Sequence, residues 1–223
     1  MSNFIGPDHE PQVLQFARYN ASDEDEDDYD YLHCIRVSSE MPTFLLQDTA
    51  ALSEDVGPLG GGKSIRELEK LGISHRYIEL KHQTLPVPAT LFCPEQDVLW
   101  FSHEIDNEDV NAMAPYYGVQ LGRIRNVIFE ETEWDATKCL KLLEHFPGVQ
   151  TIYVWLDSYR FQPGAAVATE EEYIERAKQH KMIDQVILRE RELLVEYIDE
   201  NRDVYGGFRV TKDESMDALV KQE

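Results

Sequence analysis

The residues with the clearest chemical pattern form a glycine-rich octapeptide at positions 57–64, GPLGGGKS. It fits G-x-x-x-x-G-K-[ST], the pattern of the phosphate-binding loop of nucleotide hydrolases. In such a loop the backbone amides from Gly57 to Gly62 would cradle the β-phosphate. Lys63 would reach the β and γ oxygens, and Ser64 would ligate magnesium. The pattern therefore suggests a P-loop-like nucleotide-binding protein as one hypothesis.

The residues before this octapeptide argue against nucleotide binding. A phosphate-binding loop directly follows a strand, whereas residues 52–56 read LSEDV. Glu54 and Asp55 would also repel a triphosphate. Glycine, proline, serine and acidic residues are frequent over 48–64, which is the composition of a loop. We therefore interpret residues 41–63 as a Gly-rich linker with short elements, and we keep the nucleotide site as the alternative.

The other residue types that could do chemistry are scattered. None of the histidines or cysteines has the spacing of a metal site, and no G-x-S-x-G nucleophile elbow is present. We expect no cofactor and no metal, and we favour a protein without catalytic residues over an enzyme. The scattered residues are His9, His33, His75, His82, His103, His145, His180, Cys34, Cys93 and Cys139.

A run of acidic residues stands near the start of the chain, at positions 23–28. Like charges at this density repel one another, so we predict an acidic, largely disordered tail over residues 1–40. The same run could dock a basic protein partner. Trp134, which lies in a predicted loop between acidic residues, is a second candidate for partner binding, although packing in the core or the loop is its favoured interpretation. The candidate residues of the run are Asp23, Glu24, Asp25, Glu26, Asp27 and Asp28.

Regular structure is clearest in the middle of the chain. Two β-rich segments within 89–102, separated by the turn residues 94–97, predict a hairpin. A strand at 126–130, a helix at 136–146 with Asp135 as its N-cap, and an apolar strand at 151–156 predict a βαβ unit.

A long helix is expected to follow the βαβ unit. Thr169 and Glu172 form a capping box for it, and apolar residues continue to Ile198. Gly206 and Gly207 would end the helix. We therefore predict an α/β fold in which a small mixed sheet, with a β-hairpin and a βαβ unit, is covered by helices. A single domain would span 64–205, and a charged C-terminal tail would span 206–223.

Three segments resemble a large fungal family of uncharacterised proteins named for two E-x-R motifs. Residues 92–101, FCPEQDVLWF, are similar to the family's F-N-P-x-x-D-T-L-Y-F segment. Residues 121–127, LGRIRNV, and residues 143–154, LEHFPGVQTIYV, are similar to two later segments. The family's P-E-L-R start is missing, and 64–70 read SIRELEK where the second E-x-R is expected. The resemblance implies a divergent or N-terminally truncated member, fungal and intracellular, with no catalytic residue to carry over.

Net charge narrows the classes of partner. The chain of 223 residues has 43 acidic and 21 basic residues, which gives a net charge of −22. An average field of this sign repels nucleic acids and anionic membranes. The odd number of cysteines and the lack of a long apolar segment predict a cytoplasmic or nuclear location. The leading hypothesis is a non-enzymatic protein-interaction module that binds an unknown, basic protein partner.

Overall fold

A seven-stranded mixed sheet organises the protein, in the strand order β2-β1-β5-β6-β7-β8-β9. The computed structural model describes residues 12–19, 32–37, 70, 74–102, 105–156, 169–188, 192–199 and 203–210. The strands of the sheet are β1 (Val13–Tyr19), β2 (Leu32–Val37), β5 (Val98–Phe101), β6 (Asn126–Glu130), β7 (Thr151–Trp155), β8 (Leu193–Ile198) and β9 (Val204–Val210).

The five inner strands of this sheet are parallel to one another, whereas the edge strands β2 and β9 pair antiparallel with β1 and β8. A parallel strand inside a sheet is covered on both faces, which requires apolar residues in succession. All four residues of β5 are buried, as are four of the five residues of β6. The apolar segments of the sequence are therefore the strands that lie in the middle of the sheet.

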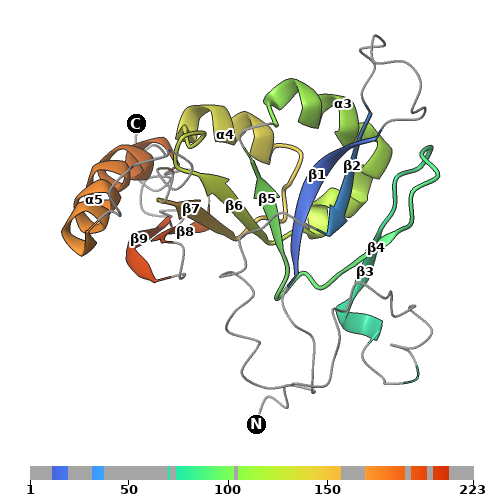
Figure 1. Cartoon of the computed structure of the whole chain (residues 1–223), viewed down its shortest axis with the longest axis horizontal. Coiled ribbons are helices and arrows are strands. Elements are labelled where there is room, and N and C mark those ends of the chain that lie inside the picture. Colours follow the sequence, from blue (N-terminus) through green and yellow to red (C-terminus); the bar gives the residue numbers. More distant parts are fainter. Residues whose placement is uncertain are drawn as a thin grey trace, which may run out of the picture.

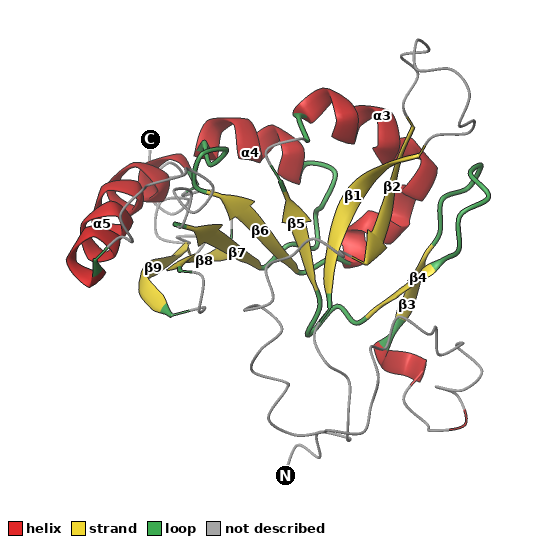
Figure 2. Cartoon of the chain, in the orientation of Figure 1, coloured by secondary structure: helices red, strands yellow, loops and turns green. Residues whose placement is uncertain are grey.

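Three helices connect the parallel strands in turn and lie on one face of the sheet (Figure 1). They are α3 (Asn107–Tyr117), α4 (Ala136–Leu143) and α5 (Glu170–Ile187), and η2 (Gly118–Arg123) follows α3 directly. We call the opposite face the helix-free face, because no helix among the described residues packs on it (Figure 2). The helices thus divide the sheet into two faces with different surroundings.

The main core lies between the helices and the sheet. Phe101 of β5 stacks on Phe129 of β6 with ring centroids 4.7 Å apart, and Phe146 meets Phe101 edge-on at 5.5 Å. Such aromatic pairs are each worth about 0.5–1.5 kcal/mol beyond the area that they bury. A smaller apolar cluster, which includes Trp100 and Trp155, lies on the helix-free face. Both faces of the sheet are therefore apolar at their centre.

A two-stranded antiparallel sheet stands beside the large one. Its strands are β3 (Ile78–Leu80) and β4 (Thr90–Phe92), with the short helix η1 (Ser74–Arg76) before them. Phe92 and Leu80 are fully buried and join the main core. The small sheet is thereby attached to the α3 side of the molecule.

Much of the predicted α/β architecture is confirmed. The strands at 126–130 and 151–155, with α4 between them, form the expected parallel pair. The side chain of Asp135 accepts hydrogen bonds from the backbone N–H of Thr137 and Lys138 at the start of α4. Thr169 and Glu172 form the capping box of α5.

The predicted hairpin over 89–102 is wrong in its pairing. Strands β4 and β5 both form, and residues 94–96 form the expected turn. However, β4 pairs with β3, whereas β5 pairs with β1 and β6. The apolar segment 98–101 is buried on both faces, so it occupies the middle of the sheet, which a two-stranded hairpin could not provide.

The predicted tails are also partly wrong. Strands β1 and β2 lie within the expected N-terminal tail 1–40, because Leu14 and Phe16 alternate with residues of the other face and pack into the main core. At the other end α5 stops at Ile187, and β8 and β9 follow it, so Gly206 lies in a strand instead of a tail. The acidic run 23–28, the linker 41–63 and residues 211–223 lie outside the described residues.

Candidate functional site

The predicted nucleotide loop is not placed by the structure. Gly57, Gly62, Lys63 and Ser64 lie outside the described residues, as does the acidic run 23–28. The three cysteines lie in described strands, turns and helices, and all are buried. Burial raises the pKa of each of these thiols, which keeps them protonated and poor nucleophiles.

Trp134 packs in the core, which is the favoured of its two interpretations, and its side chain is not available as a partner anchor. Its side chain is 8% exposed and packs against Phe129. The indole Nε1 donates a hydrogen bond to Oδ2 of Asp184 at 2.8 Å. Because Trp134 lies directly before α4, its ring fills the space between α4 and α5, and the indole N–H is already used inside the protein.

A row of charged residues holds α5 on the sheet. Glu131 follows β6 and lies 2.7 Å from Nη1 of Arg176 and 3.2 Å from Nε2 of His180, both on α5. Arg176 also donates to the carbonyl oxygen of Leu156 at the end of β7. These groups are partly buried and already engaged with one another, so we interpret the row as a clasp for α5.

His82 has a structural role as well. Among the histidines whose burial the structure describes it alone is buried, and its ring stacks on Tyr116 with centroids 4.6 Å apart. Its Nδ1 accepts hydrogen bonds from the backbone N–H groups of Leu85 at 3.0 Å and Thr84 at 3.3 Å. Burial lowers the pKa of His82, consistent with a neutral ring that shapes the loop after β3. Nowhere in the described ranges do three or more metal-ligating side chains gather.

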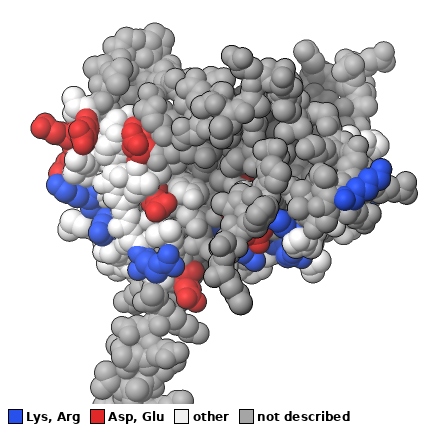
Figure 3. Space-filling view, turned by 90° about the horizontal axis from the view of Figure 1, so that it is seen from below, with Lys and Arg blue, Asp and Glu red and all other residues white. Residues whose placement is uncertain are grey.

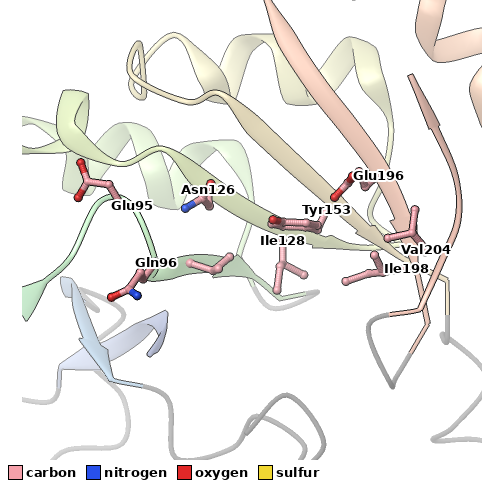
Figure 4. Close-up of a pocket in the computed structure, with 9 residues that line it drawn as sticks. Glu95, Gln96, Asn126, Ile128, Tyr153, Glu196, Ile198 and Val204 are labelled. Carbon is pink, nitrogen blue, oxygen red and sulfur yellow. The ribbon is translucent and has the colours of Figure 1, made fainter. Parts of the chain in front are cut away.

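The best candidate for a binding site is a groove on the helix-free face, over β5 to β9 (Figure 4). Its volume is about 310 Å³, at the lower end of the range for small-ligand sites. The lining residues are Glu95, Gln96, Val98, Asn126, Ile128, Tyr153, Glu196, Ile198 and Val204.

Strand register explains the order of side chains in the groove. Trp100, Ile128, Tyr153 and Glu196 are Cα partners in sequence across β5, β6, β7 and β8. Their side chains therefore form one row on the same face, with neighbouring strands about 4.8 Å apart. In this row Tyr153 lies between the apolar side chain of Ile128 and the carboxylate of Glu196. Ile128 and Ile198, both buried, form the floor (Figure 4).

The turn before β5 supplies the other end of the groove. Asp97 is fully buried, and its carboxylate accepts hydrogen bonds from the backbone N–H of Gln12 at 2.9 Å and of Cys93 at 2.6 Å. Asn126 donates from its amide to the backbone oxygens of Pro94 and Asp97, at 3.2 Å each. These bonds fix the turn, and the turn carries Glu95 and Gln96 to the rim.

Charge in the groove is mainly acidic. Its carboxylates are Glu95 and Glu196, which lie on opposite sides of Tyr153 in Figure 4. Glu95 already pairs with the guanidinium of Arg125, 3.2 Å away, at an exposed position. An apolar floor, an aromatic ring and the carboxylate of Glu196 suit a ligand that combines a cationic group with an aliphatic stem, such as a lysine or arginine side chain.

The sequence does not predict this groove, for identifiable reasons. Val98 and Ile128 belong to predicted strands, but their shared face depends on the long-range pairing of β5 with β6. Glu196 falls within the long helix that the sequence predicts, and this hides its place in a strand beside Tyr153. The alternation of Leu193, Val195 and Tyr197, all buried, with half-buried residues is the signal that indicates β8.

Comparisons with known proteins leave the class of the protein open. No protein-family model, no curated protein and no solved structure matches the chain. Within the described ranges, no helix has the length and apolar content needed to cross a membrane. The fold and the groove define an α/β protein with a partly apolar groove that carries two carboxylates.

Proposed function

We propose that this protein is a non-enzymatic protein-interaction module that seats a lysine or arginine side chain of its partner in the groove. The observation that carries the proposal is the pairing of Tyr153 with Glu196 above the floor made by Ile128 and Ile198. The ring and the carboxylate would both attract a cation, and the floor would cover its aliphatic stem. A partner of this kind needs no catalytic group in the groove.

The energies favour a charged side chain over an apolar one at this position. A cation over an aromatic ring gains about 0.5–1 kcal/mol at an exposed site and about 2 kcal/mol when it is desolvated. A hydrogen bond to a charged group adds about 1.5–3 kcal/mol. Glu196 is half-buried, so its contribution is screened less than that of a surface carboxylate.

The charge of the whole chain supports the same partner. A net charge of −22 attracts basic surfaces and raises their rate of encounter. In the view of Figure 3, acidic and basic side chains of the described residues are interspersed, without a large area of one sign. The acidic run 23–28 would act as an auxiliary docking segment in this proposal. Deletion of residues 20–31 should weaken the binding of basic partners. It should not remove the preference for lysine or arginine, which the groove determines.

Family, location and the nucleotide alternative stay predictions beside this proposal. Membership of the fungal E-x-R family and a cytoplasmic or nuclear location agree with an interaction module. The nucleotide alternative depends on Lys63 and Ser64. Calorimetric titration with ATP or GTP and magnesium, with Lys63→Ala as the control, tests it. Saturable binding that is lost in this variant would support a nucleotide-binding protein and contradict the proposal of an interaction module.

The groove is tested by fluorescence anisotropy with nine-residue peptides that differ only in their central residue. Lysine, arginine, norleucine and glutamate are compared at that position, in 50 mM and 150 mM salt. We expect the lysine and arginine peptides to bind at least tenfold more tightly than the norleucine peptide. Glu196→Gln should reduce this preference about tenfold or more, since it keeps the shape of the side chain and removes its charge.

Glu79→Gln serves as the matched control, because Glu79 is an exposed residue of β3 outside the groove. It removes the same charge from the molecule and should leave the peptide preference unchanged. Equal loss in both variants would mean that only net charge matters. That result, or equal binding of the lysine and norleucine peptides, would refute the groove as a basic-side-chain site.

A further inference from the structure

The outer side of α5 carries aliphatic residues without cover. Met182, Ile183 and Val186 are 76%, 61% and 64% exposed. They are three of the five large hydrophobic side chains that are exposed in the described residues, and the other two, Val119 and Val204, lie on other elements. Isolated exposed apolar residues are common on protein surfaces, but three neighbours on one helix form a patch.

Helical spacing places these residues in line with acidic ones. Counted at about 100° per residue, Glu171, Glu175, Met182 and Val186 fall within about 60° of one another around α5. We call this strip, with Ile183 at its side, the α5 outer face. Its amino-terminal half carries Glu171 and Glu175 and its carboxyl-terminal half is aliphatic, while the exposed Lys178 lies between the two halves, about 20° to the side of Glu171. The 15 steps from Glu171 to Val186 span about 22 Å at a rise of 1.5 Å per residue.

The opposite side of α5 is already used for folding. Tyr173, Ala177 and Asp184 are buried against the sheet and α4, and Gly206 of β9 lets the helix approach closely. A Cβ on Gly206 would stand 3.1 Å from Cβ of Ala177. The α5 outer face therefore makes no contribution to the main core, and it points away from the groove, which is on the helix-free face of the sheet.

A second copy of the chain is opposed chiefly by charge, because an antiparallel pairing centred near residue 184 would still bring Met182 of one copy beside Val186 of the other. Antiparallel pairing of two α5 helices about their middle would set Met182 and Val186 of one copy against Glu175 and Glu171 of the other. Parallel pairing would set glutamate against glutamate. Each copy also carries a net charge of −22, so two copies repel each other. The order of the glutamates and the aliphatic residues along α5 therefore favours a partner with the complementary order over a second copy.

We propose that the α5 outer face docks an amphipathic helix whose first half is aliphatic and whose second half is rich in arginine or lysine. In antiparallel orientation the aliphatic half would cover Met182, Ile183 and Val186, and the basic half would meet Glu171 and Glu175. Basic residues near its carboxyl end would also favour the dipole of the docked helix. Binding at this face is independent of the groove proposed above.

The probe for this proposal is an 18-residue fluorescent peptide with leucines along one face of its first half and arginines along the same face of its second half. A peptide of identical composition, with leucine and arginine distributed around the helix, is the peptide control. We expect anisotropy to show saturable binding of the patterned peptide, at least tenfold tighter than that of the scrambled peptide. Circular dichroism should report added helix on binding.

Variants of the full chain separate the aliphatic and acidic contributions. Met182→Ser combined with Val186→Ser should lower the affinity for the patterned peptide at least tenfold. Val119→Ser is the matched control, because Val119 is 93% exposed on η2, and it should have no effect. Glu175→Arg should weaken the arginine peptide at least tenfold, and a peptide with glutamate in place of its arginines should regain binding to this variant.

Three results would overturn the proposal. The first is equal binding of the patterned and scrambled peptides, and the second is no binding of either at millimolar concentration. The third is concentration-dependent dimerisation in sedimentation velocity that disappears in the Met182→Ser, Val186→Ser variant, since the occupant would then be a second copy. An unchanged preference for lysine and arginine peptides in Glu196→Gln, with intact binding of the patterned peptide at α5, would refute only the groove.

Discussion

Asp184 is the residue on which three elements converge. It is buried on α5, and its Oδ2 accepts hydrogen bonds from the indole of Trp134 at 2.8 Å and the hydroxyl of Tyr197 at 2.6 Å. Burial raises the pKa of Asp184 and also that of Tyr197. The two donors partly offset the cost of burying the carboxylate. Asp184 is thus needed chiefly as an acceptor.

Two substitutions of Asp184 should have opposite effects on stability. Asp184→Ala would leave the N–H of Trp134 and the hydroxyl of Tyr197 buried without an acceptor, which should lower the free energy of unfolding by about 2–4 kcal/mol. Asp184→Asn keeps an oxygen acceptor and removes the buried charge. It should therefore be at least as stable as the original chain at pH 7, as measured by urea denaturation.

The pH dependence checks the cause. A carboxylate whose pKa is raised in the folded state binds its proton more tightly when folded. The contribution of Asp184 to stability therefore falls as pH rises from its ordinary value of 3.8 through the folded pKa. The advantage of Asp184→Asn should appear above this window and vanish below it. An advantage that does not change with pH would contradict the assignment to charge burial.

At the scale of elements, close backbone contacts fix how helices and turns meet. Gly148, in the turn between α4 and β7, is the tightest case. A Cβ at this position would lie 2.0 Å from the carbonyl oxygen of Gly122 and 3.2 Å from that of Ile124. No side-chain rotation can relieve a contact with backbone, so the turn and η2 would have to separate.

Gly148→Ala should consequently destabilise the protein by about 1–3 kcal/mol or more. Gly122→Ala is a matched control in the same contact, because its Cβ would meet Pro147 at an ordinary 3.5 Å. The control should change the urea midpoint by a small amount. If both variants unfold at the same urea concentration, the packing of the turn against η2 does not limit stability.

Local signals of the sequence are sufficient for some elements and not for others. The N-caps Asp135 and Thr169 act within their own helix, so short-range chemistry predicts them well. The strand at 193–198 follows a helix without a strong stop, and its apolar residues also fit a helical period, which is why the predicted helix runs too far. Pairing of β5 with β1, across more than 80 residues, leaves no local signal.

The candidate site follows the same division between local and long-range signals. Asp97 is expected in a turn, and it is there, but its two backbone partners come from the turn and from the residue before β1. Glu196 and Tyr153 become neighbours only through the register of β7 and β8. Residue type can suggest a ligand, whereas the groove itself depends on the order of strands in the sheet.

At the scale of the whole molecule, charge is the dominant feature. The 43 acidic residues exceed the 21 basic ones by 22, so the compact state must hold many like charges together. Self-repulsion of this kind lowers the stability of a folded chain. The ion pairs of Glu131 with Arg176 and His180 are partly buried and are screened less by salt than exposed charges.

Salt should therefore stabilise this protein. Raising NaCl from 10 mM to 150 mM shortens the screening length from about 30 Å to about 8 Å, which weakens repulsion between distant carboxylates. We expect the melting temperature to rise, by about 2–4 °C for each kcal/mol gained.

Sodium sulfate at equal ionic strength should give the same rise if screening is the cause, and a larger one if exclusion of sulfate from the surface dominates. The double variant Glu79→Gln, Glu192→Gln, which removes two exposed charges, should respond less to salt. A melting temperature that falls with NaCl would contradict this prediction. It would mean that attraction between neighbouring opposite charges outweighs repulsion between distant carboxylates.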